Sequence, residues 1–351
     1  MKITNLTAFY PRYRQPLAGW RPQLWQIVVR VETDRGVVGW GYGGGGLSAL
    51  PIINGHFRQL LVGRTLESRT DIMTLWDELY AASIPYGRKG VAIMALSGVD
   101  LALWDLLGQA ERLPVYQLLG GQPRTRLRAY ATGQESAWYA ELGYTAHKFS
   151  HRWTGDPADY DQAVAHAELA RTHFGQGALL MVDCYMSWDA TVTTEMARRL
   201  APYRLYWFED LLTPDDLSGQ AALRGELGSV LVAGGEHEFT HYGFQEVARQ
   251  GALDLWQPDI TWCGGITAGL RIVELAQQQQ IPVVPHRGGE VWGLHLIAAS
   301  ACADLAEVLP GTRQAQPDPL WQDEPQVTAG YLTLSDAPGF GVTINEAMLS
   351  L

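Results

Sequence analysis

The sequence predicts an α/β protein: a (β/α) barrel of the TIM type, preceded by an α+β unit. Three observations lead to this fold class. Apolar runs typical of buried strands recur at intervals of 21 to 27 residues, about the length of one strand, one helix and two short loops. Each run leads into a polar residue, as expected where parallel barrel strands end at a common mouth. The first third of the chain instead places strands before helices.

The N-terminal unit opens with strand patterns. Gln26 to Glu32 and Val37 to Trp40 flank a turn sequence, which predicts a hairpin. The run Gly43 to Gly46 permits unusual backbone angles, and the sequence leaves open whether it is a flexible loop tip or a ligand contact. Helical spacing follows and is strongest from Val91 to Leu107.

The second unit starts near residue 125, and helices are expected at Asp156 to Thr172, Thr193 to Leu200 and Ile266 to Gln280. After about residue 326 the alternation stops, and this tail is expected to pack back on the first unit. The predicted domains are residues 1–122, 123–325 and 326–351. Eight candidate barrel strands lie near Leu127, His147, Met181, Trp207, Leu231, Trp256, Val284 and Leu305.

Composition limits the possible partners. The chain has 351 residues, 47% of them hydrophobic and 18% charged, as in ordinary globular proteins. Its formal net charge of -11 argues against nucleic acid or an anionic membrane as a partner. Cys184, Cys263 and Cys302 lack CxxC spacing, which favours a reduced, cytoplasmic setting without disulfides. Neither a signal peptide nor a membrane span is expected.

Three acidic residues follow successive predicted strands: Asp183, Glu209 and Glu236. Adjacent strands are about 4.8 Å apart, so these carboxylates would crowd together. Like charges this close force protonation unless a cation compensates them. All-oxygen ligation favours Mg²⁺ over zinc. The alternative, a separate Lys or Arg partner for each carboxylate, is less compatible with three acids at this regular spacing.

Asp259 and His286 follow the sixth and seventh predicted strands. A carboxylate beside an imidazole fixes its tautomer and raises its basicity, as a general base requires. Glu307, on the eighth strand, could hydrogen-bond a substrate oxygen if it is protonated. His286 could instead be an ordinary loop histidine.

Other candidates carry weaker signals. Lys148, at the end of the second strand, could be a second acid/base or could only neutralise charge. His237 could donate a proton, or it could hydrogen-bond a metal ligand and hold that ligand in position. The candidates for substrate binding are Arg14, Arg21, Tyr42 and His151, and a solvated surface role is the alternative for each.

The series of strand-end residues resembles that of the enolase superfamily, in its mandelate racemase and muconate lactonizing enzyme branch. The resemblance covers essentially the whole chain and is closest to the acid-sugar dehydratases related to L-rhamnonate dehydratase. The stretches that carry it are Asp183-Cys184-Tyr185-Met186-Ser187-Trp188, Gly235-Glu236-His237-Glu238, Gln257-Pro258-Asp259, Trp262-Cys263-Gly264-Gly265 and Val283-Val284-Pro285-His286.

The resemblance implies an enolase-like fold: an α+β capping domain, a (β/α)7β barrel and a C-terminal return to the cap. It implies one Mg²⁺ per subunit held by Asp183, Glu209 and Glu236, with an Asp259–His286 dyad as base and Glu307 as hydrogen-bond donor. Racemases of this branch carry Lys-x-Lys on the second strand, whereas this chain has Lys148-Phe149-Ser150. The missing second lysine favours a one-base dehydratase over a two-base racemase.

The predicted activity is therefore a Mg²⁺-dependent acid-sugar dehydratase that forms a 2-keto-3-deoxy sugar acid. An epimerase, racemase or cycloisomerase that uses Lys148 opposite His286 is the alternative enzyme. A non-catalytic protein that binds small acids is the alternative outside catalysis. The expected partner is a small carboxylate, and the resemblance also implies a homo-oligomer.

Overall fold

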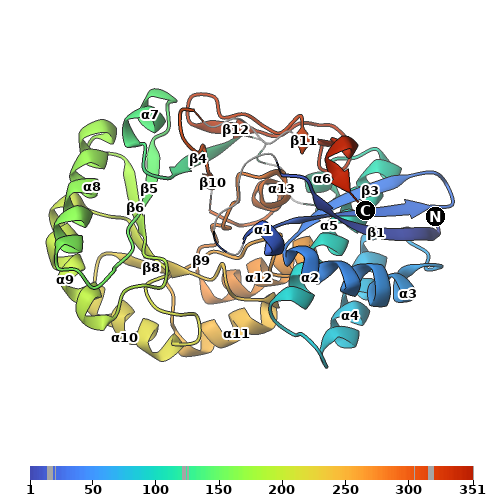
Figure 1. Cartoon of the computed structure of the whole chain (residues 1–351), viewed down its shortest axis with the longest axis horizontal. Coiled ribbons are helices and arrows are strands. Elements are labelled where there is room, and N and C mark those ends of the chain that lie inside the picture. The colour runs from blue at the N-terminus through green and yellow to red at the C-terminus, as the bar shows by residue number, and fades with distance from the viewer. Residues whose placement is uncertain are drawn as a thin grey trace.

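A curled parallel sheet with outer helices and an antiparallel sheet with its own helices lie side by side in the molecule (Figure 1). This computed structural model describes residues 1–13, 19, 21–120, 124, 126–303, 305–314 and 320–350. The arrangement confirms the predicted fold class, an enolase-like combination of a barrel and an α+β unit. The predicted domain limits stay a prediction.

The antiparallel sheet has the strand order β14-β1-β2-β3. The predicted hairpin is confirmed, because β2 and β3 pair along their whole lengths around a turn at Gly36, whose φ is 71°. Both termini of the chain meet in this sheet, since the last strand pairs with the first. The strands are β1 (Ile3–Pro11), β2 (Ile27–Thr33), β3 (Val38–Gly43) and β14 (Leu349–Ser350).

Helices cover one face of this sheet. The longest described among them, α5 (Val91–Glu111), is buried over most of its length, and it extends the predicted helix by four residues. A capping box at Ser68 and Asp71 starts α4 (Arg69–Ser83). The remaining helices of this unit are α1 (Arg21–Leu24), α2 (Gly46–Pro51), the π-helical turn η1 (Ile52–Phe57), α3 (Arg58–Leu61) and α6 (Val115–Leu118).

The glycine run after β3 is a close contact rather than a flexible loop tip. Residues 43–46 are buried. A Cβ on Gly44 would lie 2.7 Å from the Trp262 ring, and Gly45 has a φ of 83° where α2 begins. Glycine is therefore needed here because the N-terminal unit approaches the barrel closely.

The parallel sheet follows the order β10-β4-β5-β6-β7-β8-β9. The segment at Val283 and Val284 fills the place between β9 and β10, because it hydrogen-bonds Trp256 on one side and Ala303 on the other. The sheet thus closes into a barrel, and all eight predicted strand positions are confirmed. Its strands are β4 (Arg126–Thr132), β5 (Ala146–Ser150), β6 (Leu179–Asp183), β7 (Trp207–Glu209), β8 (Leu231–Gly234), β9 (Leu255–Trp256) and β10 (Ala306–Val308).

A ring of apolar side chains fills the barrel interior. Each of the eight strand positions contributes one residue to a single buried cluster. Such a layer makes the barrel a packed core and not a pore. The cluster consists of Tyr130, Ala146, Met181, Trp207, Ala233, Leu255, Val284 and Leu305.

The outer helices match the prediction within a few residues. The predicted start at Asp156 is two residues too early, because Pro157 occupies the N-cap and α8 begins at Ala158. The predicted start at Thr193 is three residues too late. Asp189 accepts a hydrogen bond from the Val192 amide, so α9 begins at Ala190. The helices are α7 (Ser136–Glu141), α8 (Ala158–Phe174), α9 (Ala190–Leu200), η2 (Ala201–Tyr203), α10 (Leu217–Leu227), α11 (Thr240–Gln250), α12 (Gly265–Gln279) and α13 (Val291–Ala299).

The C-terminal segment contacts both units. Its strand β12 pairs antiparallel with β4 of the barrel, which the sequence did not predict. The residues after β12 return to α5, where Asp105 accepts a hydrogen bond from the Phe340 amide, as the prediction of a returning tail requires. Its elements are β11 (Trp321–Gln322), β12 (Tyr331–Thr333), β13 (Thr343–Ile344) and η3 (Glu346–Met348).

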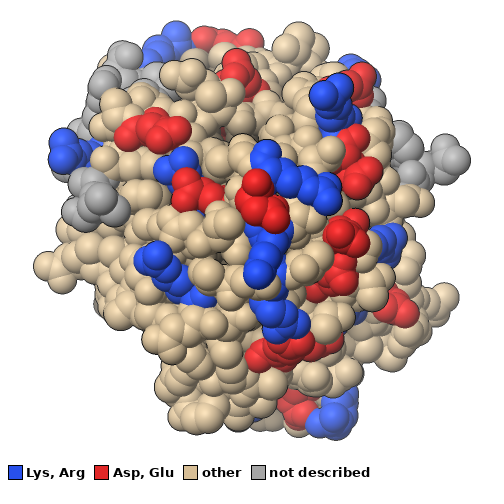
Figure 2. Space-filling view, turned by 90° about the vertical axis from the view of Figure 1, so that its right-hand side faces the viewer, with Lys and Arg blue, Asp and Glu red and all other residues tan. Residues whose placement is uncertain are grey.

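One described helix, α5, is long and apolar enough to cross a membrane by length and composition, although the sequence analysis expected none. Its apolar window is 89% buried inside the protein, as is usual for a core helix. The cysteines are free, as predicted, and they are also buried. On the face that carries the N-terminal unit, acidic and basic side chains are interspersed (Figure 2).

Asp105 should make stability depend on pH. It lies buried in α5 and accepts hydrogen bonds from the amides of Trp40 and Phe340. Burial raises its pKa to about 6, despite these hydrogen bonds. The folded state therefore holds the proton more tightly than the unfolded state, so this contribution is present below about pH 4 and is lost as pH rises to about 6.

We expect the free energy of unfolding of the wild type to fall more steeply between pH 4.5 and pH 6.5 than that of Asp105→Asn. The stability gap between the two proteins should narrow accordingly, which urea denaturation at several pH values measures. Parallel pH profiles would show that Asp105 does not carry this dependence.

Candidate active site

A polar layer lies directly above the apolar ring of the barrel. Side chains two residues apart on a strand point to the same face, so the residues two positions beyond the ring enter the same interior nearer the mouth. The Gly235 backbone, with a φ of 114°, interrupts this alternation and presents Glu236 instead. The layer comprises Thr132, Lys148, Asp183, Glu209, Gln257, His286 and Glu307.

Lys148 lies at the centre of this layer and joins two carboxylates. Its Nζ forms ion pairs with Glu209 and, at 2.8 Å, with Glu307. The lysine is 1% exposed and lies in the middle of β5 and not at its end, where the sequence analysis placed it. Burial lowers its pKa, but the charges of Glu209 and Glu307 outweigh burial and leave the pKa well above its usual range. Lys148 is therefore a cation in this arrangement.

The three predicted metal ligands are close enough to influence one another. Burial, followed by the charges of Glu209 and Glu236, raises the pKa of Asp183 to about 8. Glu209 is the deepest of the three, and its second oxygen accepts hydrogen bonds from Trp207 Nε1 at 2.9 Å and Gln257 Nε2 at 2.7 Å. The site therefore has a local excess of negative charge that a divalent cation could neutralise.

Asp210 is a further carboxylate that the sequence analysis missed. One ligand atom each of Asp210, Glu236 and His237 lie within 4.8 Å of one another. Burial and the charges of Glu236 and Asp183 raise the Asp210 pKa well above its usual range. The regular interval between strand ends predicts one carboxylate at each end, and the adjacent acids Glu209-Asp210 were the signal for a second one. A positive φ of 48° turns Asp210 away from the direction that strand alternation would give it.

The predicted dyad is present. His286 Nδ1 lies 2.8 Å from Asp259 Oδ2. Burial acts to raise the Asp259 pKa, but the hydrogen bond from His286 and the charge of Arg287 outweigh it and lower the pKa. An ionised Asp259 accepts a hydrogen bond from Nδ1–H of His286. The other ring nitrogen, Nε2, therefore faces the mouth, 3.3 Å from Glu236 Oε2.

Surrounding carboxylates make His286 strongly basic. Burial lowers its pKa, but the charge of Glu236 and the hydrogen bond to Asp259 outweigh burial and raise the pKa to about 10. A cation bound by Glu236 would weaken that effect and bring the imidazole back toward neutrality.

Glu307 accepts hydrogen bonds on both oxygens, which differs from the predicted donor role. Thr132 and Lys148 approach Oε1, and the Arg287 amide donates to Oε2 at 2.7 Å. Burial raises its pKa, but Lys148 and then His286 outweigh burial and bring the pKa to about 2. Glu307 is therefore the acceptor in this arrangement, and its partners are the donors.

The four predicted substrate contacts have different surroundings. Tyr42 is buried against Trp292, 3.5 Å from the Tyr13 hydroxyl, and burial raises its pKa. Arg21 is exposed, with its guanidinium 4.5 Å from the Trp25 ring. Arg14 lies outside the described residues.

His151 needs a correction. It is 4% exposed, and its ring packs against Trp188 and against His166 of α8. The side chain therefore faces the layer of helices outside the barrel. Residues after a strand end point alternately in and out, and the sequence alone did not fix which direction His151 takes.

His237 lies at the rim of the site. Its Nε2 is 3.2 Å from Glu236 Oε1, and its ring stacks on Trp262 at 6.0 Å. This is compatible with either predicted role, ligand support or proton donation.

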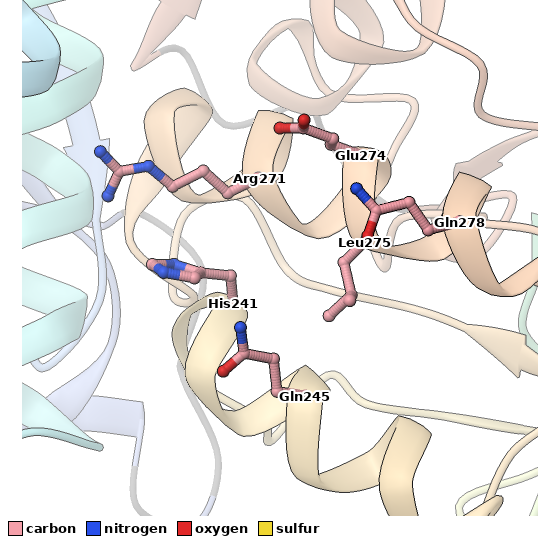
Figure 3. A pocket seen from close by; sticks show the side chains of 6 residues that line it. All are labelled: His241, Gln245, Arg271, Glu274, Leu275 and Gln278. Atoms are coloured by element: carbon pink, nitrogen blue, oxygen red, sulfur yellow. The ribbon is translucent and has the colours of Figure 1, made fainter.

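A separate groove lies on the outer surface, between α11 and α12 (Figure 3). Arg271 in this groove already forms a bidentate ion pair with Asp77 of α4. None of the residues of the polar layer lines this groove. It is lined by His241, Gln245, Arg271, Glu274, Leu275 and Gln278.

Two family models match the chain. The model described as "Enolase C-terminal domain-like" matches residues 132–348. The model described as "Mandelate racemase / muconate lactonizing enzyme, N-terminal domain" matches residues 21–120. The chain belongs to the mandelate racemase/muconate lactonizing enzyme family. The resemblance seen in the sequence is thereby confirmed.

Relatives within this family include dehydratases and isomerases. The L-rhamnonate dehydratase of Saccharopolyspora erythraea is 37% identical, over 98% of this chain and 89% of that protein. The L-rhamnonate dehydratase structure from Gibberella zeae is 32% identical with a TM-score of 0.88, covering 99% of this chain and 95% of that one. The 3,6-anhydro-D-galactonate cycloisomerase of Zobellia galactanivorans is 28% identical with a TM-score of 0.87, and both chains are fully covered.

We expect Asp183→Asn and Glu236→Gln to weaken the binding of a divalent cation by at least about tenfold. Loss of an outer-shell partner of a metal site already lowers affinity by about this factor, so loss of a direct ligand should lower it at least as much. Titration calorimetry with Mg²⁺, or Mn²⁺ electron paramagnetic resonance, measures the change. Glu238→Gln is the matched control, because Glu238 is already paired with Lys89 at 2.7 Å. Equal affinities in all four proteins would place the cation elsewhere.

Proposed function

We propose that this protein is a Mg²⁺-dependent acid-sugar dehydratase that acts on L-rhamnonate or a closely related aldonate. The observation that carries the proposal is the His286–Asp259 dyad, which presents Nε2 to a mouth crowded with carboxylates. Full-length relatives named L-rhamnonate dehydratase support the choice of substrate. A non-catalytic binding protein would have no need for the dyad.

The residues at the mouth fit a hard divalent cation. Their donors are carboxylate oxygens, and burial together with the charges of Glu209 and Glu236 raises the pKa of Asp183. We propose Asp183, Glu209 and Glu236 as ligands, with Asp210 and His237 beside them. The relative from Gibberella zeae has been crystallised with Mg. When bound, Mg²⁺ would withdraw electrons from the substrate carboxylate and make its α-proton more acidic.

His286 then acts as the general base. Its Nδ1–H is held by Asp259, so the lone pair of Nε2 is available to accept the α-proton. The resulting enediolate carries negative charge on the carboxylate oxygens. The cation Lys148, held between Glu209 and Glu307, supplies positive potential to this region of the layer.

Elimination completes the reaction. The electron pair of the enediolate forms the Cα–Cβ double bond as the β-hydroxyl leaves, taking a proton to become water. Protonated His286 or the neighbouring His237 would donate that proton. The enol product then tautomerises to a 2-keto-3-deoxy sugar acid.

An isomerase of the same family is the second candidate, because an isomerase is among the similar structures. It would need Lys148 as a second base. Lys148 is already paired with Glu209 and Glu307, and Ser150 stands where a second lysine would be needed, which favours the one-base dehydratase. We further propose that Arg14, Arg21 and Tyr42 contact the distal end of the substrate, and that the protein is a homo-oligomer.

The first experiment is proton NMR in D₂O with the Mg²⁺-loaded enzyme and a panel of aldonic and aldaric acids. We expect the α-proton signal of L-rhamnonate to disappear. A new proton signal should appear from the deoxygenated carbon, C3 of the product. Epimer signals or α-proton exchange without dehydration would establish the isomerase instead.

We expect His286→Asn to lower kcat for the accepted acid at least about 100-fold, because general base catalysis is lost. Mg²⁺ binding should remain, since the proposed ligands are unchanged. His56→Asn, which alters a histidine of the N-terminal unit bonded to Tyr86, is the control and should keep full activity. Retained turnover in His286→Asn would rule out this residue as the base.

A further inference from the structure

We propose that Gln26 of the N-terminal unit is a positioning residue for the His286–Asp259 base of the barrel. The inference rests on the proposed function, in which this dyad removes the α-proton. Gln26 is fully buried, immediately before β2, and contacts the loop that follows β9.

The Gln26 amide has one possible orientation. Trp262 Nε1 can only donate, and it lies 2.8 Å from Gln26 Oε1. The amide nitrogen, Nε2, must therefore point the other way, where it lies 2.9 Å from Thr261 Oγ1. The Gln26 carbonyl also accepts a hydrogen bond from the Tyr13 hydroxyl at 2.7 Å, which fixes the backbone at this position.

The hydrogen bond from Gln26 fixes the donor direction of Thr261, which in turn contacts Asp259. Because Thr261 Oγ1 accepts from Gln26, its own hydrogen is free to donate to Asp259 Oδ1, 2.6 Å away. The Thr261 amide donates to the same oxygen at 2.7 Å. Asp259 is thus held through Oδ1, and its Oδ2 faces His286 Nδ1.

The oxygen of the Gln26 amide holds the Trp262 ring, which lies beside His286. The Trp262 ring lies 5.7 Å from the His286 ring and stacks on His237 at 6.0 Å. Its place is restricted further by the close approach of Gly44. One buried amide therefore fixes both the acceptor that orients His286 and the ring beside it.

This arrangement makes the catalytic base depend on the docking of the N-terminal unit. Ser97 and Trp76 of the same unit also hold the end of the loop, through the amide and the carbonyl of Gly264. These contacts fix the backbone, whereas the contact of Gln26 with Thr261 reaches Asp259 through side-chain atoms. Loss of Gln26 should therefore disturb catalysis beyond any loss of stability.

The first test compares Gln26→Leu, Thr261→Val and Thr261→Ser in the Mg²⁺-loaded enzyme. Loss of a residue that orients a functional side chain from the outer shell of a metal site typically lowers activity about 10- to 100-fold. We expect kcat to fall by this factor in the Leu and Val variants, with KM little changed. The isotope effect on kcat with substrate deuterated at the α-carbon should rise, because proton removal becomes slower. Thr261→Ser keeps the hydroxyl and should restore the rate.

Trp104→Phe is the matched control. It removes a buried hydrogen bond of the same kind between the two units, from Trp104 Nε1 to Thr267 Oγ1 at 3.1 Å, away from the dyad. We expect it to lower the unfolding temperature without changing the isotope effect. An unchanged isotope effect in Gln26→Leu and Thr261→Val would reduce Gln26 to a structural role and overturn the proposal.

A second readout needs no turnover, so it separates failure of this proposal from failure of the proposed function. In protein labelled with ¹⁵N-histidine, the His286 Nδ1 proton bonded to Asp259 should resonate at low field. We expect Gln26→Leu and Thr261→Val to shift this signal or to broaden it by exchange with solvent, and Trp104→Phe to leave it unchanged. An unaltered signal in both test variants would contradict the positioning role, whatever the substrate proves to be.

Discussion

The crowding of carboxylates at the barrel mouth is the constraint on which the rest of the site depends. Asp183, Glu209, Asp210 and Glu236 lie within one electrostatic neighbourhood, and burial together with the neighbouring carboxylates raises the pKa values of Asp183, Glu209 and Asp210. Lys148 offsets part of this charge from inside the barrel. A hard divalent cation is the natural complement, and the hydrogen bond to Asp259 keeps His286 oriented as a base when that cation is bound.

The second constraint is geometric. The apolar ring and the polar layer follow from the two-residue repeat of a strand, so the interior core and the chemical groups are set by the same backbone. The exception is Asp259, which orients the base His286 and lies on a loop beyond β9 and not on the strand itself. Its position is supplied from the N-terminal unit, through Gln26 and the contacts at Gly264. The two units therefore form one functional structure even though their sheets are separate.

Much of this arrangement could be predicted from the sequence, and the failures have physical reasons. The barrel strands and the dyad were predictable because apolar runs leading into Asp183, Glu209 and His286 repeat at a regular interval. Asp210 was missed because a positive φ, invisible in the sequence, redirects its side chain. The outward direction of His151, the acceptor role of Glu307 and the contacts of Gln26 with residues 235 positions away depend on tertiary packing, which no local pattern encodes.

The most direct test of the charge argument is calorimetric titration of the protein with Mg²⁺ at pH 7 in buffers of different ionisation enthalpy. With a pKa raised to about 8, Asp183 retains a proton at pH 7 that a bound cation would displace. Net proton release on binding is expected at pH 7, from Asp183 and from His286, whose raised pKa a bound cation would lower. Binding without proton release at pH 7, or no binding at all, would contradict the claim that crowded carboxylates form the cation site.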